Sequence, residues 1–273
     1  MITGANSGIG KATAEKLAGL GAIVVMVCRS RDKGEKALAE VRRKSGSSAP
    51  ELLLADLASL QSVRNLAGEY LRNHDALHVL VNNAGVAAVR RSVTGDGFET
   101  TFQVDYLSQF LLTNLLLDAL RKSAPSRIVM VSSASHYAGH LDLGDLQMAK
   151  GYGVMKAYSR AKLAQVLFTY ELARRLEGSG VTANCLHPGT VATNMWEKPL
   201  GPLSFLMKVN RLFLISPEEG AETPVYLASS PEVERVSGRY FDQKREKQSS
   251  TESYDRELAR KLWDESAAMV GLA

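Results

Sequence analysis

The chain has 273 residues, of which 45% are hydrophobic and 23% are charged, and its formal net charge is +4. This composition is that of an ordinary soluble globular protein, long enough for one large α/β domain. Basic residues are interleaved with acidic ones, as in Glu35-Lys36 and Arg256-Glu257. That arrangement favours solvated helix faces and argues against nucleic-acid binding.

The sequence indicates neither a targeting segment nor a metal site. It has no signal peptide and no apolar stretch long enough to cross a membrane, so we expect a cytoplasmic protein. The two cysteines, Cys28 and Cys185, both fall in apolar runs that are typical of strands. We expect them to be packing residues rather than a disulfide or metal ligands.

A glycine-rich turn opens the chain. Residues 3–10 read Thr-Gly-Ala-Asn-Ser-Gly-Ile-Gly, and an alanine-rich helical pattern follows. Glycines permit positive φ and close backbone approach, and the start of a helix attracts anions. A nucleoside-triphosphate loop is excluded, because Ala12 follows Lys11 where a hydroxyl would hold magnesium. We therefore predict a dinucleotide phosphate site at Gly4, Asn6, Ser7, Gly8, Ile9 and Gly10, with a turn that binds nothing as the alternative.

Only Met1-Ile2 precede this turn, although the architecture needs a strand there, in the middle of the sheet. We therefore expect the first strand to be truncated. Our hypothesis is that the natural protein starts further upstream. Mass spectrometry of the native protein that finds Met1 as its true start would reject this hypothesis.

The rest of the chain alternates strand and helix patterns. Repeated βα units without a low-complexity linker predict a single α/β domain over 1–273, with a doubly wound, mostly parallel sheet flanked by helices, which is the Rossmann fold. The predicted strands are 22–28, 51–55, 77–81, 127–131, 181–187 and 238–242, and the predicted helices are 31–44, 59–73, 98–122, 158–176, 217–229 and 253–270.

Residues that follow the predicted strands are candidates for cofactor binding, because ligands of such sheets bind at the carboxyl ends of the strands. Arg29 comes directly after the second strand, and no acid follows until Asp32. An acidic residue there suits the ribose 2′-hydroxyl of NAD, whereas an arginine suits the 2′-phosphate of NADP. We therefore predict NADP(H), with a simple surface helix start at Arg29 as the alternative. The other candidates at strand ends are Asp56, Leu57, Asn82, Ala84, Gly85, Pro188 and Gly189.

Tyr158 and Lys162 are spaced to lie on one face of a helix. A free tyrosine titrates near pH ~10, and a nearby lysine charge lowers that pKa. Proton transfer is most efficient when the pKa of the group is close to the working pH, so the pair suits a proton donor or acceptor for an alcohol oxygen. Tyr152 and Lys156 have the same spacing, but the flanking Gly151 and Gly153 indicate a loop.

Taken in order, these motifs resemble the short-chain dehydrogenase/reductase family, and in particular its branch that includes the retinol dehydrogenases. The resemblance covers essentially the whole chain. It rests on Thr3–Gly10, Asn82–Gly85, Val131–Ser133, Ala157–Lys162 and His187–Gly189, and on the tail segments Ser237–Phe241 and Leu258–Trp263.

The resemblance implies roles for individual residues. Tyr158 matches the catalytic acid/base, Lys162 its electrostatic partner and a ligand of the nicotinamide ribose, and Ser133 the hydroxyl that binds the substrate oxygen. Residues 188–193 resemble the segment that grips the carboxamide and phosphates of the cofactor, which adds Val191 and Thr193 to the cofactor-binding candidates.

Asp105 departs from the family pattern. The family usually has asparagine at this position, where it helps to hold a water that connects the lysine to solvent. An aspartate could stabilise Lys162 as a cation, but it would also oppose the Tyr158 phenolate and raise its pKa. We therefore expect catalysis to be slower or its pH optimum to be shifted.

The segment 191–216 is rich in large apolar residues, such as Trp196, Phe205 and Phe213. We interpret it as a lid over a lipophilic aldehyde or ketone. Two alternatives are an amphipathic membrane-surface helix with Lys208 and Arg211 at the interface, and ordinary packing of a surface helix.

A catalytically weak NADP(H)-binding sensor or scaffold is the rival function, and Asp105 is its sequence support. The resemblance also implies a homodimer formed through the two long helices.

Overall fold

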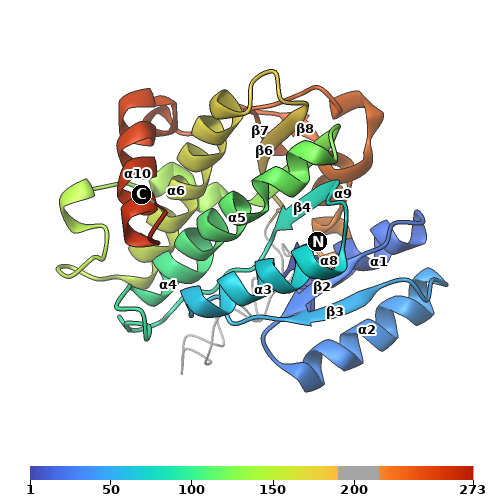
Figure 1. Ribbon diagram of the computed structural model, residues 1–273. Helices are drawn as coiled ribbons and strands as arrows, with labels where there is room; N and C mark the ends of the chain where they lie inside the picture. The colour runs from blue at the N-terminus through green and yellow to red at the C-terminus, as the bar shows by residue number, and fades with distance from the viewer. Residues whose placement is uncertain (190–214, 273) are drawn as a thin grey trace.

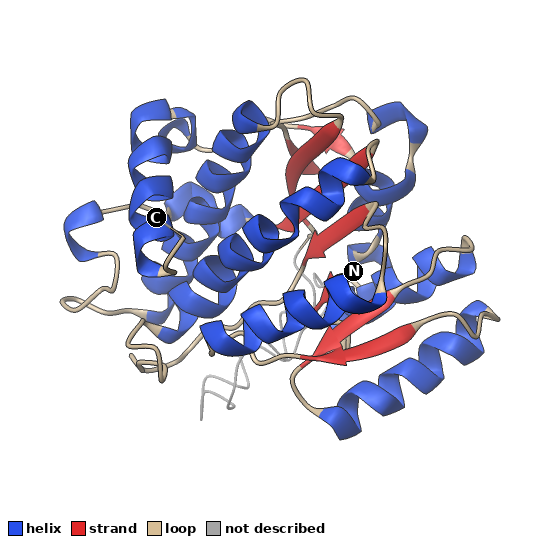
Figure 2. Ribbon diagram, in the orientation of Figure 1, coloured by secondary structure: helices blue, strands red, loops and turns tan. Residues whose placement is uncertain are grey.

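The computed structural model describes residues 1–189 and 215–272. Its strands form one eight-stranded sheet in the order β3-β2-β1-β4-β5-β6-β7-β8, in which only the β7–β8 pair is antiparallel. The strand order reverses at β1, so the sheet is doubly wound as predicted (Figure 2). The strands are β1 (Ile2–Thr3), β2 (Val25–Cys28), β3 (Glu51–Leu54), β4 (Val79–Asn82), β5 (Ser126–Val131), β6 (Val181–His187), β7 (Tyr240–Asp242) and β8 (Arg245–Glu246).

Helices cover both faces of this sheet (Figure 1). Alternate residues of β2 point to opposite faces. Val25 and Val27 belong to the apolar cluster of α3, α5, α6 and α10, whereas Met26 and Cys28 belong to that of α1 and α2. The main helices are α1 (Gly8–Gly19), α2 (Arg31–Ser45), α3 (Leu60–Asn73), α4 (Thr100–Phe102), α5 (Ser108–Lys122), α6 (Val154–Arg175), α8 (Pro217–Gly220), α9 (Glu222–Ser229) and α10 (Arg256–Met269).

Several short helical turns connect these elements. A five-residue π-helical turn, η1 (Gln103–Leu107), joins α4 to α5. The 3-10 turns are η2 (Ala134–Ala138), η3 (Leu143–Asp145), η5 (Pro231–Val233) and η6 (Thr251–Tyr254). Within residues 1–189 and 215–272, no helix is both long and apolar enough to span a membrane.

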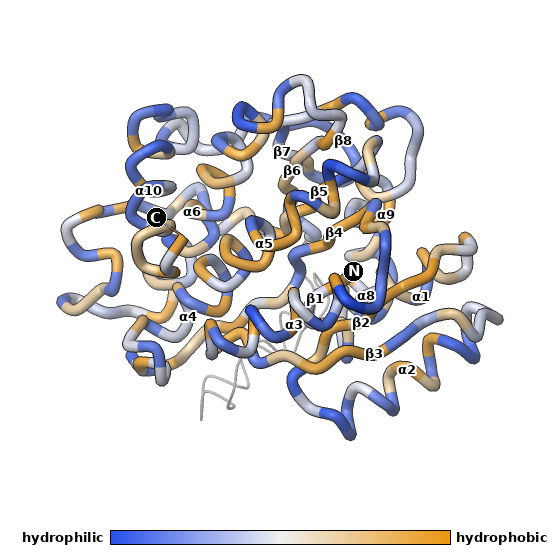
Figure 3. The backbone as a smooth tube through the Cα atoms, in the orientation of Figure 1, coloured by the Kyte–Doolittle hydropathy of each residue, from blue (hydrophilic) through white to orange (hydrophobic). Residues whose placement is uncertain are grey.

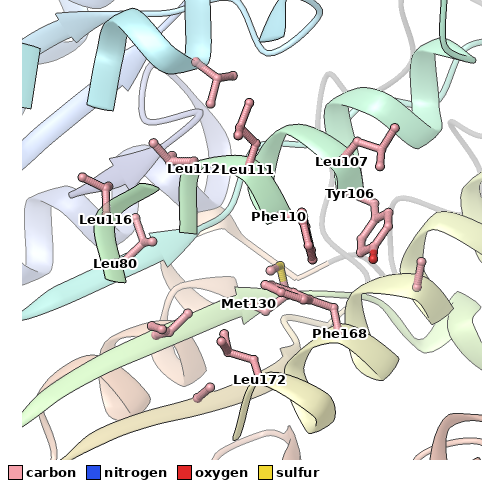
Figure 4. Packing of buried hydrophobic residues seen from close by; sticks show 14 of the residues in the cluster. Leu80, Tyr106, Leu107, Phe110, Leu111, Leu112, Leu116, Met130, Phe168 and Leu172 are labelled. Atoms are coloured by element: carbon pink, nitrogen blue, oxygen red, sulfur yellow. The ribbon is translucent and has the colours of Figure 1, made fainter. Parts of the chain in front are cut away.

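The larger of the two apolar clusters lies between the sheet and the layer of α3, α5 and α6. Leu116 of α5 points toward Leu80 of β4, and Phe110 of α5 points toward Phe168 of α6, which lies over Met130 of β5 (Figure 4). Apolar sequence runs through the strands and along α5 (Figure 3). Burial of each large apolar side chain contributes about 1.5–3 kcal/mol, so this layer supplies much of the free energy that holds the sheet.

β1 contains two residues but occupies the centre of the sheet. Ile2 pairs with Met26 of β2 and with Val81 of β4. The ammonium group of Met1 donates a hydrogen bond to the carbonyl of Val79 at 2.8 Å. Burial lowers the pKa of this ammonium group to about 5. This short central strand therefore pairs with a neighbouring strand on each side, β2 and β4.

The predicted fold class is confirmed, and most predicted elements agree within a few residues. Three differ. The predicted helix 98–122 is interrupted by the π-helical turn η1, the predicted helix 217–229 is divided into α8 and α9, and the edge strand β8 was not predicted. Most of the segment 191–216, interpreted above as a lid, lies outside the described residues.

Candidate active site

The glycine turn lies between β1 and α1. Gly4 and Gly8 have φ angles of 66° and 54°, the left-handed region that favours glycine. A Cβ on Gly10 would lie 2.5 Å from the carbonyl oxygen of Gly4, so a side chain cannot fit there. The side chain of Ser7 makes no cap hydrogen bond, and the first turn of α1 has no acidic residue. The N–H groups at the start of α1 therefore remain available to an anion.

The end of β4 is attached to this turn. The hydroxyl of Thr3 accepts hydrogen bonds from the backbone N–H groups of Asn83 at 2.9 Å and Ala84 at 3.0 Å. The side chain of Asn82 is fully buried and donates to Thr113 at 2.9 Å, but its Oδ1 atom has no hydrogen-bond partner within residues 1–189 and 215–272. A buried acceptor of this kind is costly unless something donates to it. The Oδ1 atom of Asn82 is therefore available to accept a hydrogen bond from a ligand.

Tyr158 and Lys162 lie one turn apart on α6, as their spacing predicted. Their exposed fractions are only 7% and 3%. The Nζ atom of Lys162 is 5.2 Å from the centroid of the Tyr158 ring and donates to the carbonyl of Val131 at 3.2 Å. The Ser132 hydroxyl donates to the carbonyl of Lys162 at 2.9 Å. The end of β5 therefore holds this part of α6.

Asp105 completes the cluster from the π-helical turn η1. Its Oδ2 atom is 3.3 Å from Lys162 Nζ, and its Oδ1 atom accepts a hydrogen bond from the N–H of Val86 at 2.7 Å. A Cβ on Gly85 would lie 3.2 Å from Oδ2, so the loop after β4 passes close to the pair. Burial raises the pKa of Asp105 to about 6 despite Lys162. At neutral pH the aspartate is therefore the charged partner of the lysine.

The pKa of Tyr158 lies above its ordinary value. Burial is the largest cause, Lys162 lowers the pKa as predicted, and the Asp105 carboxylate raises it. The nearby Ser133 hydroxyl also lowers it. Burial by itself would lower the pKa of Lys162, but the Tyr158 and Asp105 charges raise it above its ordinary value. Lys162 is therefore a cation, although its charge alone does not decide the net shift of Tyr158.

Ser133 follows β5, and two histidines hold the backbone of Ser133 and Ala134. Its hydroxyl accepts a hydrogen bond from the N–H of Ser135 at 3.1 Å. The Nδ1 atom of His136 lies 2.7 Å from the carbonyl oxygen of Ser133, and the N–H of Ala134 donates to Nδ1 of His187 at 3.2 Å. Burial lowers the pKa of both histidines, so they are neutral at pH 7. We interpret them as supports of the Ser133 loop.

The remaining candidates have different surroundings. Arg29 is exposed directly after β2. The Asp56 carboxylate accepts from the N–H of Ala58 at 3.0 Å, and the carbonyl of the buried Leu57 accepts from the Ser108 hydroxyl at 2.5 Å. Asn6 and Ile9 are partly buried beside the glycine turn. All of them except Leu57 expose some surface at the edge where a dinucleotide would lie.

Pro188 and Gly189 follow β6 and line a cavity of about 480 Å³ together with His187 and Thr223. Ser133 and Tyr158 are not among the residues that line it. Its lining includes Gly189 and Ile215, which flank residues 190–214 in the sequence, so we assign it no ligand. Val191 and Thr193 lie outside the described residues.

Two buried glutamines of the site were not identified from the sequence. Gln165 donates to the carbonyl of Asp105 at 2.6 Å and to Oε1 of Gln109 at 3.0 Å, and Gln109 donates to the carbonyl of Ala84 at 2.5 Å. Together they connect α6, the π-helical turn and the end of β4. Their helical spacing, four residues after Asp105 and three after Lys162, was the available signal.

The residues of the carboxyl edge fit a dinucleotide, because Gly4 and Gly10 leave no room for a Cβ and no donor to Asn82 Oδ1 lies in the part of the chain that the structure describes. With a doubly wound sheet and a tyrosine–lysine pair at the same edge, they define an oxidoreductase that uses a nicotinamide cofactor. Residues 1–200 match the short chain dehydrogenase family, and the chain belongs to that family.

Curated relatives of this chain are retinol dehydrogenases. The chain is 48% identical to human (Homo sapiens) retinol dehydrogenase 14, with all of this chain and 86% of that protein covered. It is 46% identical to mouse (Mus musculus) retinol dehydrogenase 13, with all of this chain and 84% of that protein covered.

Two solved structures are similar over most of the chain. A putative uncharacterized protein from Mycobacterium paratuberculosis matches with a TM-score of 0.81 and 34% identity, over 99% of this chain and 92% of that one. The RhlG/NADP active-site complex of Pseudomonas aeruginosa matches with a TM-score of 0.72 and 25% identity, over 88% of this chain and 92% of that one.

Proposed function

We propose that this protein interconverts a lipophilic aldehyde or ketone, of retinoid type, and the corresponding alcohol, with NADP(H) as cofactor. The observation that carries this proposal is the buried cluster of Tyr158, Lys162 and Asp105 beside the loop after β4. The retinoid class is supported by the names of the relatives at 46–48% identity.

The cofactor, when bound, supplies the hydride chemistry. In carbonyl reduction, the Tyr158 hydroxyl gives its proton to the substrate oxygen. The Ser133 hydroxyl donates a hydrogen bond to the same oxygen as negative charge develops on it. Lys162 is a cation one turn away and reduces the cost of the phenolate that Tyr158 becomes. In alcohol oxidation the same groups act in reverse.

The preference for NADP(H) over NAD(H) is proposed from Arg29. The variant Arg29→Ala is expected to weaken NADPH binding by about 10-fold or more and to leave NADH binding almost unchanged, because a charge-assisted contact to phosphate is worth about 1.5–3 kcal/mol. Dissociation constants of both cofactors test this. Arg31→Ala is the matched control, since Arg31 is also exposed but pairs with Glu35. Tighter NADH than NADPH binding by the unmodified protein would refute the assignment.

The substrate class is tested by NADPH turnover with a panel of aldehydes of increasing apolar length, ending in retinoid aldehydes. We expect kcat/KM to rise with apolar surface, by up to about fourfold per buried CH₂ group, which corresponds to about 0.8 kcal/mol. Equal values for short polar and long apolar aldehydes would contradict the lipophilic pocket.

A second candidate function is a catalytically weak NADP(H)-binding sensor or scaffold. The observation in its favour is the Asp105 carboxylate, which raises the pKa of Tyr158 and so opposes the phenolate. Saturable NADPH binding without turnover of any aldehyde in the panel would support this candidate.

Two expectations from the sequence remain predictions. Peripheral membrane contact was one alternative for the segment 191–216, most of which lies outside the described residues. The cytoplasmic location is likewise untested.

A further inference from the structure

The helix that carries Tyr158 and Lys162 is buried on every side. All sixteen residues of α6 from Ala157 to Leu172 are buried in the single chain. A surface helix normally buries only one stripe and exposes the opposite face to solvent or to a partner. α5 is similar at its start, where every residue from Ser108 to Thr113 is buried. The outer faces of α6 and of the first half of α5 are therefore already covered.

The cover is the C-terminal part of the same chain. We call residues 247–270 the C-terminal wrap; it contains η6 and α10, and Figure 1 shows α10 beside α6. At its start, the hydroxyl of Ser249 lies 2.7 Å from the hydroxyl of Tyr170 on α6. The ring of Tyr254 stacks on the ring of Tyr170 with a centroid distance of 5.5 Å.

Trp263 of α10 fills the groove between α5 and α6. Its ring centroid lies 5.0 Å from that of Phe110 on α5 and 5.5 Å from that of Phe168 on α6. The guanidinium group of Arg175, on α6, lies 4.2 Å from the centroid of the Trp263 ring. Aromatic pairs contribute about 0.5–1.5 kcal/mol each beyond their burial, so this contact is strong for a helix on the outside of a domain.

The wrap also reaches the turn that presents Asp105. The hydroxyl of Ser266 lies 2.7 Å from that of Tyr106, the residue next to Asp105, and both side chains are fully buried. On the same side of α10, Leu262 is fully buried and Ala259 and Val270 are nearly so. α10 thus has a continuous inner face that is matched to α6 and η1.

We propose that the C-terminal wrap occupies the face of α5 and α6 that a second copy of the chain would otherwise cover, and that the protein is a monomer. This is opposed to the homodimer through the two long helices that the resemblance implies. A dimer of that kind would have to displace α10 and expose Leu262 and Trp263 to water. The proposal does not depend on the substrate or on catalysis.

Sedimentation velocity on the full chain across micromolar concentrations tests the monomer directly. We expect one species with the mass of a single chain, 29.6 kDa. A species of twice that mass, with lysine or photo-cross-links between α5 or α6 of two chains, would overturn the proposal. A dimer whose cross-links lie outside α5 and α6 would refute the monomeric state but not the claim that the wrap covers these helices. The two parts of the proposal can therefore be tested separately.

Hydrogen exchange on two matched variants tests the wrap itself. Leu262→Asp places a charge in the inner face of α10, and Arg260→Asp places the same charge on its exposed side. We expect faster amide exchange in both α10 and α6 for Leu262→Asp. For Arg260→Asp we expect the exchange rates of both helices to be unchanged. If Leu262→Asp does not fold, Trp263→Ala is used, with faster exchange expected in the same helices. Unchanged exchange of α6 in a folded Leu262→Asp or Trp263→Ala variant would show that the wrap does not cover it.

Discussion

Replacing Tyr158 with phenylalanine is expected to reduce kcat for aldehyde reduction by about 10²- to 10⁴-fold, the usual contribution of a general acid or base. The ring fills the same space, so the fold and cofactor binding are expected to be retained. Only the transferable proton is removed. Steady-state kinetics with NADPH, together with the dissociation constant of the cofactor, measure the two effects separately.

Tyr152→Phe is the matched control for this prediction. Tyr152 has a lysine at the same spacing, but it lies before α6 begins, and its hydroxyl donates to the carbonyl of Ala88 at 2.6 Å. We expect the control to keep kcat within a few-fold, since one neutral hydrogen bond is worth about 0.5–1.5 kcal/mol. Full activity of Tyr158→Phe, or an equal loss in Tyr152→Phe, would remove Tyr158 from its assigned role.

The variant Lys162→Met is expected to lose activity and also stability. It leaves the Asp105 carboxylate in a fully buried position without its cation. Removal of one partner of a buried ion pair typically costs about 3–5 kcal/mol, because the remaining charge stays desolvated. Denaturant unfolding at pH 8 measures this loss of the free energy of unfolding. The double variant Asp105→Asn/Lys162→Met is expected to regain most of the stability but none of the activity.

The pH dependence of the stability of Lys162→Met distinguishes an unpaired Asp105 carboxylate from a simple packing defect. Burial raises the pKa of Asp105 from 3.8 to about 6 with Lys162 present, and removal of Lys162 raises it further. A group whose pKa is raised by folding favours the folded state at low pH and loses that effect as the pH rises through the folded-state value. The stability of Lys162→Met should therefore fall from about pH 4 to beyond pH 6 relative to the double variant.

Comparison of the two variants isolates Asp105, because they share every other titrating group, including the buried ammonium group of Met1. Parallel stability curves across this pH range would show that Asp105 has the same pKa in the folded and unfolded states, so that burial does not raise it. If Asp105→Asn/Lys162→Met loses as much stability as Lys162→Met, the loss comes from the missing packing of the lysine stem and not from the unpaired carboxylate.

Local sequence was sufficient for the fold and for the tyrosine–lysine pair. Alternating βα patterns determine a doubly wound sheet because parallel strands need crossover helices. Since residues four apart share a helix face, Tyr158 and Lys162 were certain to be neighbours once α6 was recognised. The glycine turn was also readable, because positive φ and the absence of a Cβ are properties of the residue itself.

Only the tertiary structure decided how this pair is charged and enclosed. The π-helical turn that carries Asp105 has no signature in the helical pattern 98–122, and it is held by Gln165 from a distant helix. The net pKa shift of Tyr158 is a balance of burial against charges contributed by separate elements, so no local pattern contains it. Likewise, the burial of α6 depends on where a C-terminal helix docks, roughly ninety residues later in the chain.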